Sequence, residues 1–386
     1  MYEEVKIMRE NGKLRFNPNG TFKIVQIADT QEIPEVSPDT LKLIEAVLDR
    51  EKPDLAVFTG DQVKGYSTYF RGKPEKVKSC IAQLIKPLED RKIPFAVTFG
   101  NHDDQCGLNN LEQLDLYKES PMCVSDTVPG LTGGGTDFLP VYASTGDKPA
   151  LGIYLIDSQG NQGDGYAPVA QDEIEWYRQK RDELEKENGG KVLPSILFQH
   201  IPLKEYYHVL VRKTKKEKGF IRAFREHKGS FFGLDEKLRN SDVEFMGEVP
   251  ASPYEQSGQF DAIHEKGDVF AVYVGHDHNN CFVRNYKGID FGYTPGCGFN
   301  VYGPGLNRGI RVLEFNEQDP RAYKTHVDTF KELCGTKLQK PLLNFLYCHA
   351  PTNIPTALFW ARNAVLTLLG AGAVIAAIVL LIEHFM

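Results

Sequence analysis

TFKIVQIADTQE, residues 21–32, contains a largely apolar run that stops abruptly at a carboxylate. Residues 22–28 have the length and composition of a β-strand, and Asp29 follows at the carboxyl end of that strand. Open α/β sheets gather their ligands just beyond the carboxyl ends of strands, so Asp29 is a candidate metal ligand. Two residues later stands Gln31, an amide at a position where a metal site would be expected to use an imidazole.

Outward from this stretch, short runs rich in Val, Ile and Phe alternate with longer amphipathic segments. This alternation is typical of a layered α/β domain. From about residue 269 onward one strand-like run follows another, which predicts an antiparallel, hairpin-rich second half. We therefore predict an α/β fold in which two mixed β-sheets form a sandwich flanked by helices. The expected strands are 22–28, 54–60, 94–100, 151–157, 194–200, 269–275, 280–288, 289–296 and 309–315, and the expected helices are 37–51, 73–91 and 170–188.

The composition is that of a globular protein without a basic bias. The chain has 386 residues, enough for one large domain or two small ones, with 41% hydrophobic and 25% charged residues. A formal net charge of −7 argues against a dedicated nucleic-acid binder, so no nucleic-acid partner is expected. Seven cysteines without a CxxC pair indicate reduced thiols rather than a disulfide framework.

The C-terminal segment 364–382 contains no charged residue, and its length is close to the ~20 residues that a helix needs to cross a bilayer. The alternative is a buried helix, but such a helix should carry a polar stripe. Basic residues precede the segment and Glu383 follows it, which predicts a single-pass, C-terminally anchored membrane protein whose large domain is cytoplasmic. The predicted organisation is a domain over 1–330, a linker over 331–356 and a transmembrane anchor over 357–383.

A basic stretch, VRKTKKEKGFIRAFREHK, occupies residues 211–228. The simpler interpretation, which we favour, is a solvated insertion. The alternative is a rim that attracts an anionic substrate or an anionic membrane surface.

Polar residues able to bind metal follow several of the predicted strands. Taken singly, each has an ordinary explanation, such as a turn for Gly-Asp or a hydrogen-bonded side chain for a lone histidine. Together, at the ends of so many strands, they predict a metal site. The candidate ligands are Asp29, Gln31, Asp61, Asn101, His200, His276 and His278, with His102 and Asp103 beside them.

The order of these residues resembles the five sequence blocks of the calcineurin-like metallophosphoesterases. The blocks here are Asp29, Gly60-Asp61, Gly100-Asn101-His102-Asp103, His200 and Gly275-His276-Asp277-His278. The resemblance covers roughly residues 20–330. The stretches 155–177, 198–207 and 275–299 further resemble the single-domain branch related to plant purple acid phosphatases and their fungal relatives.

The resemblance implies two metal ions, divalent or trivalent, drawn from Mn, Fe, Mg and Zn. The two ions would share a hydroxide that attacks phosphorus, while His102 protonates the leaving oxygen as general acid and Asp103 orients the His102 ring. The first ion would be held by Asp29, Gln31, Asp61 and His278, and the second by Asp61, Asn101, His200 and His276, so that Asp61 bridges them.

Two positions depart from the family pattern. The first block of the family ends in His, and here Gln31 stands in that place. A ligating amide oxygen is a harder donor than imidazole and would shift preference toward Mn, Mg or Fe over Zn. Purple enzymes carry a tyrosine ligand three residues after the bridging aspartate, where this chain has Lys64, so no purple chromophore is expected.

The function that this resemblance implies is hydrolysis of a phosphoester substrate, with phosphomonoesters, phosphoproteins among them, as the leading expectation. A phosphodiesterase acting on nucleotides or lipid headgroups would use the same two-metal site. A third alternative, prompted by Gln31, is a degenerate, membrane-tethered binding protein.

Overall fold

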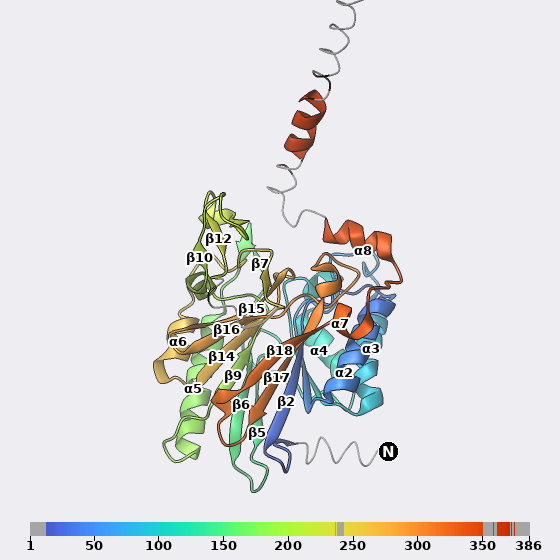
Figure 1. Cartoon of the computed structure of the whole chain (residues 1–386). Coiled ribbons are helices and arrows are strands. Elements are labelled where there is room, and N and C mark those ends of the chain that lie inside the picture. The colour runs from blue at the N-terminus through green and yellow to red at the C-terminus, as the bar shows by residue number, and fades with distance from the viewer. Residues whose placement is uncertain are drawn as a thin grey trace, which may run out of the picture.

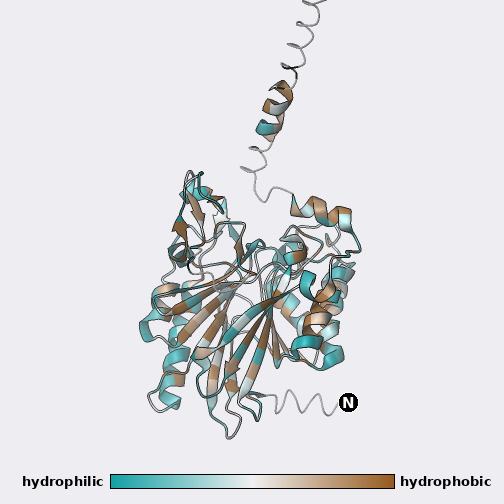
Figure 2. Ribbon diagram, viewed as in Figure 1, coloured by the Kyte–Doolittle hydropathy of each residue, from teal (hydrophilic) through white to brown (hydrophobic). Residues whose placement is uncertain are grey.

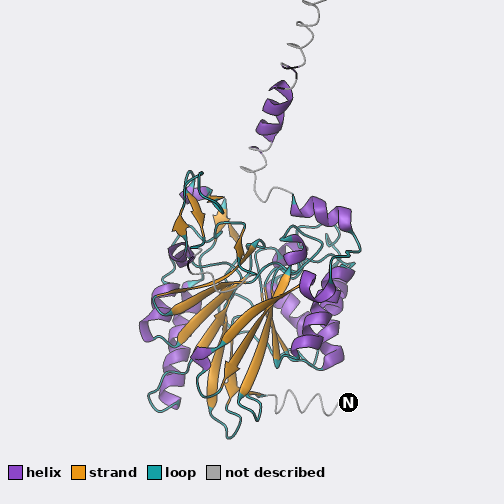
Figure 3. Cartoon of the chain, viewed as in Figure 1, coloured by secondary structure: helices purple, strands orange, loops and turns teal. Residues whose placement is uncertain are grey.

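Two β-sheets pack face to face in the computed structural model, and helices cover both outer faces (Figures 1 and 3). The fold is therefore α/β with mixed sheets, as the sequence predicts. The structure describes residues 13–235, 237, 243–349, 358, 361–370, 372 and 374.

The first sheet has five strands in the order β18-β17-β2-β3-β4. Its parallel half consists of β2 (Thr21–Ile27), β3 (Leu55–Thr59) and β4 (Phe95–Thr98), and β17 (Gly309–Asn316) and β18 (Lys324–Thr329) extend it antiparallel. Its outer face packs against α2 (Pro38–Glu51), α3 (Pro74–Arg91) and α4 (Asn110–Lys118). Ser37 starts α2 by accepting a hydrogen bond from the Asp39 amide, and Lys52 ends it in the left-handed conformation.

The second sheet has eight strands in the order β1-β5-β6-β9-β14-β16-β15-β13. The helices α5 (Gln171–Glu187) and α6 (Gln259–Lys266) cover its outer face. The strands are β1 (Leu14–Arg15), β5 (Asp137–Tyr142), β6 (Pro149–Leu155), β9 (Ser195–Phe198), β13 (Phe245–Met246), β14 (Val269–Val274), β15 (Asn280–Tyr286) and β16 (Ile289–Tyr293).

The core lies in three layers that follow from the two-residue period of the strands. Ile24 of β2 faces the sandwich interior with Val57 and Ile153, whereas Val25 faces the helices of its own sheet. Hydrophobic residues are accordingly frequent along the strands of both sheets (Figure 2). Of the strands that carry candidate ligands at their ends, β3, β4, β9 and β14 are buried throughout.

The prediction of an antiparallel second half is wrong for β14. This strand pairs in parallel with both β9 and β16. The later neighbours β15 and β16, and likewise β17 and β18, do pair antiparallel as expected. The next strand, β17, crosses to the other sheet and pairs antiparallel with β2. Strand order is a long-range property, so the run of consecutive strands did not reveal it.

Two small elements lie at the same end of the sandwich, shown at the top of Figure 1. One is a three-stranded sheet of β10 (Val211–Arg212), β12 (Phe231–Gly233) and β11 (Ile221–Arg222), built from the basic stretch and the residues after it. The other is α8 (Pro341–Cys348), which packs against the turn η5 (Gly305–Asn307).

The C-terminal predictions fall partly outside the described residues. Of the predicted span 364–382, residues 371, 373 and 375–382 are not described. No helix in the part of the chain that the structure describes is long and apolar enough to cross a membrane. Helices α7 (Phe330–Cys334) and α8 lie at or within the predicted linker, and α7 packs against α2.

Candidate metal centre

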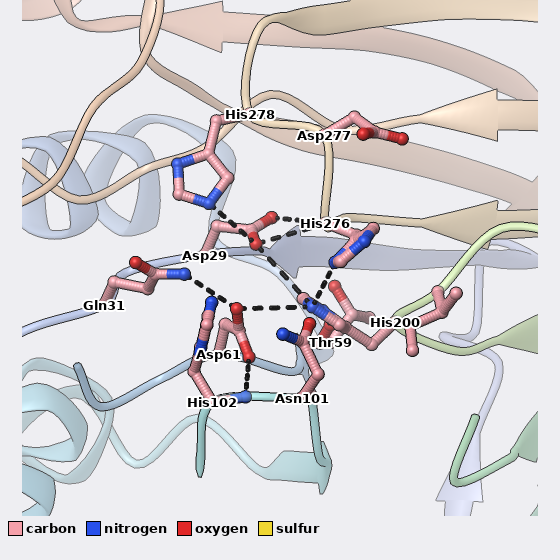
Figure 4. Close-up of polar contacts among 12 residues, drawn as sticks. Asp29, Gln31, Thr59, Asp61, Asn101, His102, His200, His276, Asp277 and His278 are labelled. Carbon is pink, nitrogen blue, oxygen red and sulfur yellow. Dashed lines mark hydrogen bonds and ion pairs between the residues drawn. The ribbon is translucent and has the colours of Figure 1, made fainter. Parts of the chain in front are cut away.

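The candidate ligands from both sheets converge at one end of the sandwich (Figure 4). Asp29 follows β2, Asp61 follows β3 and Asn101 follows β4, while the histidines come from the ends of β9 and β14. The His276 amide donates to Asp29 Oδ2 at 2.9 Å, so a backbone hydrogen bond joins the two sheets at the centre itself.

The backbone at this end is strained. Asp29, Gln31, Asp61 and His276 all adopt positive φ angles, of 53°, 34°, 53° and 72°. Each such residue costs about 1–3 kcal/mol, and such strain persists where the surrounding structure over-determines it. Close packing adds a second constraint, because a Cβ atom on Gly100 would lie 2.3 Å from Asp61 Oδ1. These loops therefore hold the candidate ligands in a conformation that the chain would not adopt alone.

A first set of donors consists of Asp29, Asp61 and His278, whose ligand atoms all lie within 4.8 Å of one another. His278 Nε2 lies 3.2 Å from Asp29 Oδ1. The other ring nitrogen, Nδ1, lies 2.8 Å from the Tyr302 carbonyl, and the Tyr302 ring stacks on the imidazole at 4.1 Å. Because a carbonyl only accepts, Nδ1 carries the proton and Nε2 presents its lone pair to the centre, as a metal-ligating histidine requires.

A second set of donors surrounds the other side of Asp61. His200 Nε2 lies 3.4 Å from Asp61 Oδ2 and 3.2 Å from His276 Nδ1. His200 Nδ1 donates to the Thr59 carbonyl at 2.9 Å, which again leaves Nε2 facing the centre. Asn101 Oδ1 is buried and has no hydrogen-bond partner among the described residues. A buried amide oxygen that lacks a hydrogen-bond donor, next to carboxylates and imidazoles, is suited to bind a cation. The two sets of donors around Asp61 therefore suit two metal ions.

The electrostatics of the centre also favour a cation. Burial tends to raise the pKa of Asp61, but His200 and His102 outweigh it and hold that pKa below its ordinary value. Burial likewise opposes protonation of His200, but Asp61 raises the pKa of His200 to about 10. Burial and the nearby His200 lower the pKa of His276 well below its ordinary value. The buried carboxylates thus attract positive charge. Because His276 stays neutral, protonated imidazoles cannot supply all of that charge, whereas neutral imidazoles can bind a metal ion that does.

The Gln31 side chain points into the centre. Its Nε2 donates to Asp61 Oδ2 at 2.7 Å, and its Oε1 accepts from the Tyr66 hydroxyl at 3.3 Å. In this orientation the amide nitrogen faces the bridging carboxylate, and a half-turn of the amide would present the oxygen instead. Ligation by Gln31 therefore remains a prediction.

The role predicted for Asp103 requires a correction. Asp103 does not orient His102, because its carboxylate accepts from the backbone amides of Gly100, Asp61 and Val63 at 2.8, 2.7 and 3.1 Å. Burial and the neighbouring Asp61 raise the pKa of Asp103 to about 8. Asp103 thus holds together the loops that carry the ligands.

The ring of His102 is oriented by residues that the sequence did not indicate. Its Nδ1 lies 2.9 Å from Gln105 Oε1, and its ring packs edge-on against Tyr66 at 4.7 Å. Gln105 Nε2 donates to the Asn101 carbonyl at 3.0 Å, which directs its oxygen toward the imidazole. The ring thus donates from Nδ1 and leaves Nε2 for a substrate.

Two further side chains lie near the ligands. Lys64 donates to the Asn300 carbonyl at 2.9 Å, so it is engaged away from the ligands. Tyr166, in β8 (Gly165–Tyr166), packs edge-on against His276 at 4.5 Å. The sequence offered no signal for Tyr166 or Tyr302 as site residues, since neither lies in a segment that carries a candidate ligand.

Comparisons with known proteins agree with this geometry. Residues 22–280 match the calcineurin-like phosphoesterase family. The chain is 28% identical over 337 residues to probable inactive purple acid phosphatase 29 of Arabidopsis thaliana, covering 78% of each chain. It is 27% identical over 359 residues to phosphatase DCR2 of Saccharomyces cerevisiae, covering 84% of this chain and 56% of that protein.

A solved structure of a dimetal phosphatase from Danio rerio aligns with a TM-score of 0.47 and 10% identity, covering 80% of this chain and 99% of the other. The family match spans the strand ends after β2, β3, β4, β9 and β14, from which all the candidate ligands come. The chain belongs to the calcineurin-like phosphoesterase family.

Proposed function

We propose that the chain is a two-metal hydrolase of phosphomonoesters, phosphoproteins included. The observation that carries the proposal is the convergence of donors from five strands on Asp61, with Asn101 Oδ1 buried and without a partner among the described residues. The relative named phosphatase DCR2 of Saccharomyces cerevisiae supports phosphatase activity.

The donors divide into two sets around Asp61. One metal ion would be held by Asp29, Asp61 and His278, with Gln31 beside them, and the other by Asp61, Asn101, His200 and His276. Two bound cations would polarise the phosphoryl oxygens and make a water nucleophile available near neutral pH.

The protein side chains would supply orientation and a proton. Thr59 and Tyr302 hold His200 and His278 through carbonyl hydrogen bonds, so that both imidazoles present Nε2 to the centre. The imidazolium form of His102 would carry a proton on Nε2 and donate it to the leaving oxygen, because Gln105 occupies Nδ1.

A second candidate is a binding protein that has lost catalysis. The names of several relatives, which call them probable inactive, and Gln31 at the first-block position favour it. Against it, all the remaining ligand positions keep metal-binding side chains, and His102 keeps an oriented ring.

The test is metal analysis and hydrolysis on the purified full chain, stripped with a chelator and reloaded with Mn, Fe, Mg or Zn. We expect two metal ions per chain and faster hydrolysis of p-nitrophenyl phosphate than of its bis-ester, with hydrolysis lost in Asp61→Asn. Stoichiometric metal without hydrolysis would establish the binding protein. Absence of bound metal in the intact protein would refute the two-metal proposal.

We propose further that residues 364–382 anchor the protein in a membrane, with the catalytic domain cytoplasmic. Support comes from the uncharged sequence of this segment and from exposed apolar residues of α8, which precedes it in the chain: Leu342, Phe345 and Leu346. Alkaline extraction of cell membranes should leave the full chain in the pellet and release the variant Leu368→Arg/Leu369→Arg. Release of both proteins, or protection of the domain from protease in sealed vesicles, would contradict this arrangement.

A further inference from the structure

The basic stretch 211–228 brings one arginine toward the metal centre. Arg225 begins the short turn η3 (Arg225–His227), which follows β11 in the small sheet. Its guanidinium lies over the Tyr166 ring, 4.4 Å from the ring centre. Tyr166 in turn contacts His276 with ring centres 4.5 Å apart, so at most about 9 Å separates the guanidinium from a candidate metal ligand.

The environment of Arg225 holds this cation in place without neutralising it. Tyr166 and Tyr254 flank the guanidinium, at 4.4 and 5.7 Å. The Nη1 atom is buried and has no hydrogen-bond partner among the described residues. The adjacent carboxylate, Glu226, instead pairs with Lys204 at 3.1 Å. A half-buried guanidinium with an unpaired nitrogen is costly in the free protein, and an incoming oxyanion would offset that cost.

The backbone conformation of Arg225 is also unusual. Its φ angle is 52°, in the left-handed region that residues other than glycine rarely adopt. Another cation of the stretch is paired locally, since Lys213 donates to the Lys218 carbonyl. Arg225 thus combines a positive φ angle with a ring contact, through Tyr166, that leads to the candidate ligand His276.

We propose that Arg225 binds an oxyanion of the phosphoester substrate beside the metal centre. This inference rests on the proposed function, and it turns part of the basic stretch into a substrate-binding element rather than a solvated insertion. The guanidinium would contact either the oxygens of the reacting phosphoryl group or a second anionic group attached to the substrate, and both sources share the fork geometry that arginine recognises.

The test compares Arg225→Gln with Arg212→Gln in the metal-loaded full chain. Arg212 is exposed, belongs to the same small sheet and lies over the Phe232 ring at 5.8 Å, so its variant reports any general effect of charge. Two probes distinguish the sources: p-nitrophenyl phosphate, which has only the phosphoryl group, and a phosphoserine peptide with an acidic neighbour.

We expect Arg225→Gln to raise KM roughly tenfold or more, the size of a lost charged hydrogen bond, with a smaller change in kcat. A rise for both probes assigns Arg225 to the phosphoryl group, and a rise for the peptide alone assigns it to the second anion. Arg225→Lys, which keeps the charge but loses the fork, should give an intermediate KM. An unchanged KM for both probes, or an equal rise in Arg212→Gln, would overturn the proposal.

A separate measurement keeps this inference distinct from the proposed function. Binding of inorganic phosphate to the metal-loaded protein is measured by calorimetry for the wild type and for Arg225→Gln. Lack of hydrolysis in the wild type refutes the proposed function alone. In an inactive wild type, weaker phosphate binding by the variant would still support Arg225 as an oxyanion site, and equal binding would refute it.

Discussion

Replacing Asp103 should destabilise the protein by an amount that its three hydrogen bonds define. Asp103 is wholly buried and accepts from the amides of Gly100, Asp61 and Val63. An unsatisfied buried donor costs about 1–3 kcal/mol. Asp103→Asn keeps one oxygen, which can accept from the Gly100 and Asp61 amides that now share Oδ2. Its amide nitrogen then faces the Val63 amide, which loses its acceptor, so we expect the free energy of unfolding to fall by about 2 kcal/mol. Asp103→Ala leaves three amides unpaired, so we expect a loss of at least about 4 kcal/mol.

The assay is equilibrium urea unfolding of the full chain without metal, followed by fluorescence, with the change in midpoint converted through an unchanged m-value. The matched control is Asp104→Ala, since Asp104 is the exposed neighbour on the same turn, and it should change stability by less than about 0.5 kcal/mol. Equal losses for Asp103→Asn and Asp103→Ala, or losses no larger than that of the control, would refute the reasoning. If Asp103 instead oriented His102, Asp103→Asn would slow substrates with poor leaving groups without lowering stability.

Three further predictions concern single side chains. His102→Ala should slow hydrolysis of alkyl phosphates more than that of p-nitrophenyl phosphate, and Gln105→Ala should do so more weakly; equal losses on both substrates would argue against proton donation. Gln31→His should tighten metal binding and shift preference toward Zn in competition titrations, and an unchanged metal profile would argue against ligation at this position. Burial and the nearby Asp157 raise the pKa of Glu173 from 4.5 to about 8, so the folded state retains a proton that the unfolded state releases. Unfolding free energy should therefore fall as pH rises from about 4.5 to about 8 in the wild type, and Glu173→Gln should flatten that slope in urea titrations; an identical slope in both proteins would contradict it.

The departures from expectation at His102 arise in one short turn. The 3-10 helix η1 (Asp103–Cys106) directs Asp103 into the loops and brings Gln105 up to the imidazole. The family resemblance implied that Asp103 orients His102, but the direction of a side chain in a tight turn depends on backbone angles that the sequence does not reveal. The contacts of Tyr302 and Tyr166 were equally hidden, because each depends on how distant loops pack.

The sequence alone determined the strand ends that bear donors, the α/β class and the order of the family blocks, because an apolar run that stops at a polar residue is a local signal. Only the tertiary structure decided that β14 lies parallel to its neighbours, that Asp103 binds backbone amides and that Arg225 reaches the neighbourhood of His276. Each of these features depends on contacts between segments far apart in the chain. Such contacts are stabilised by burial and by hydrogen bonds that exist only after the two sheets have packed.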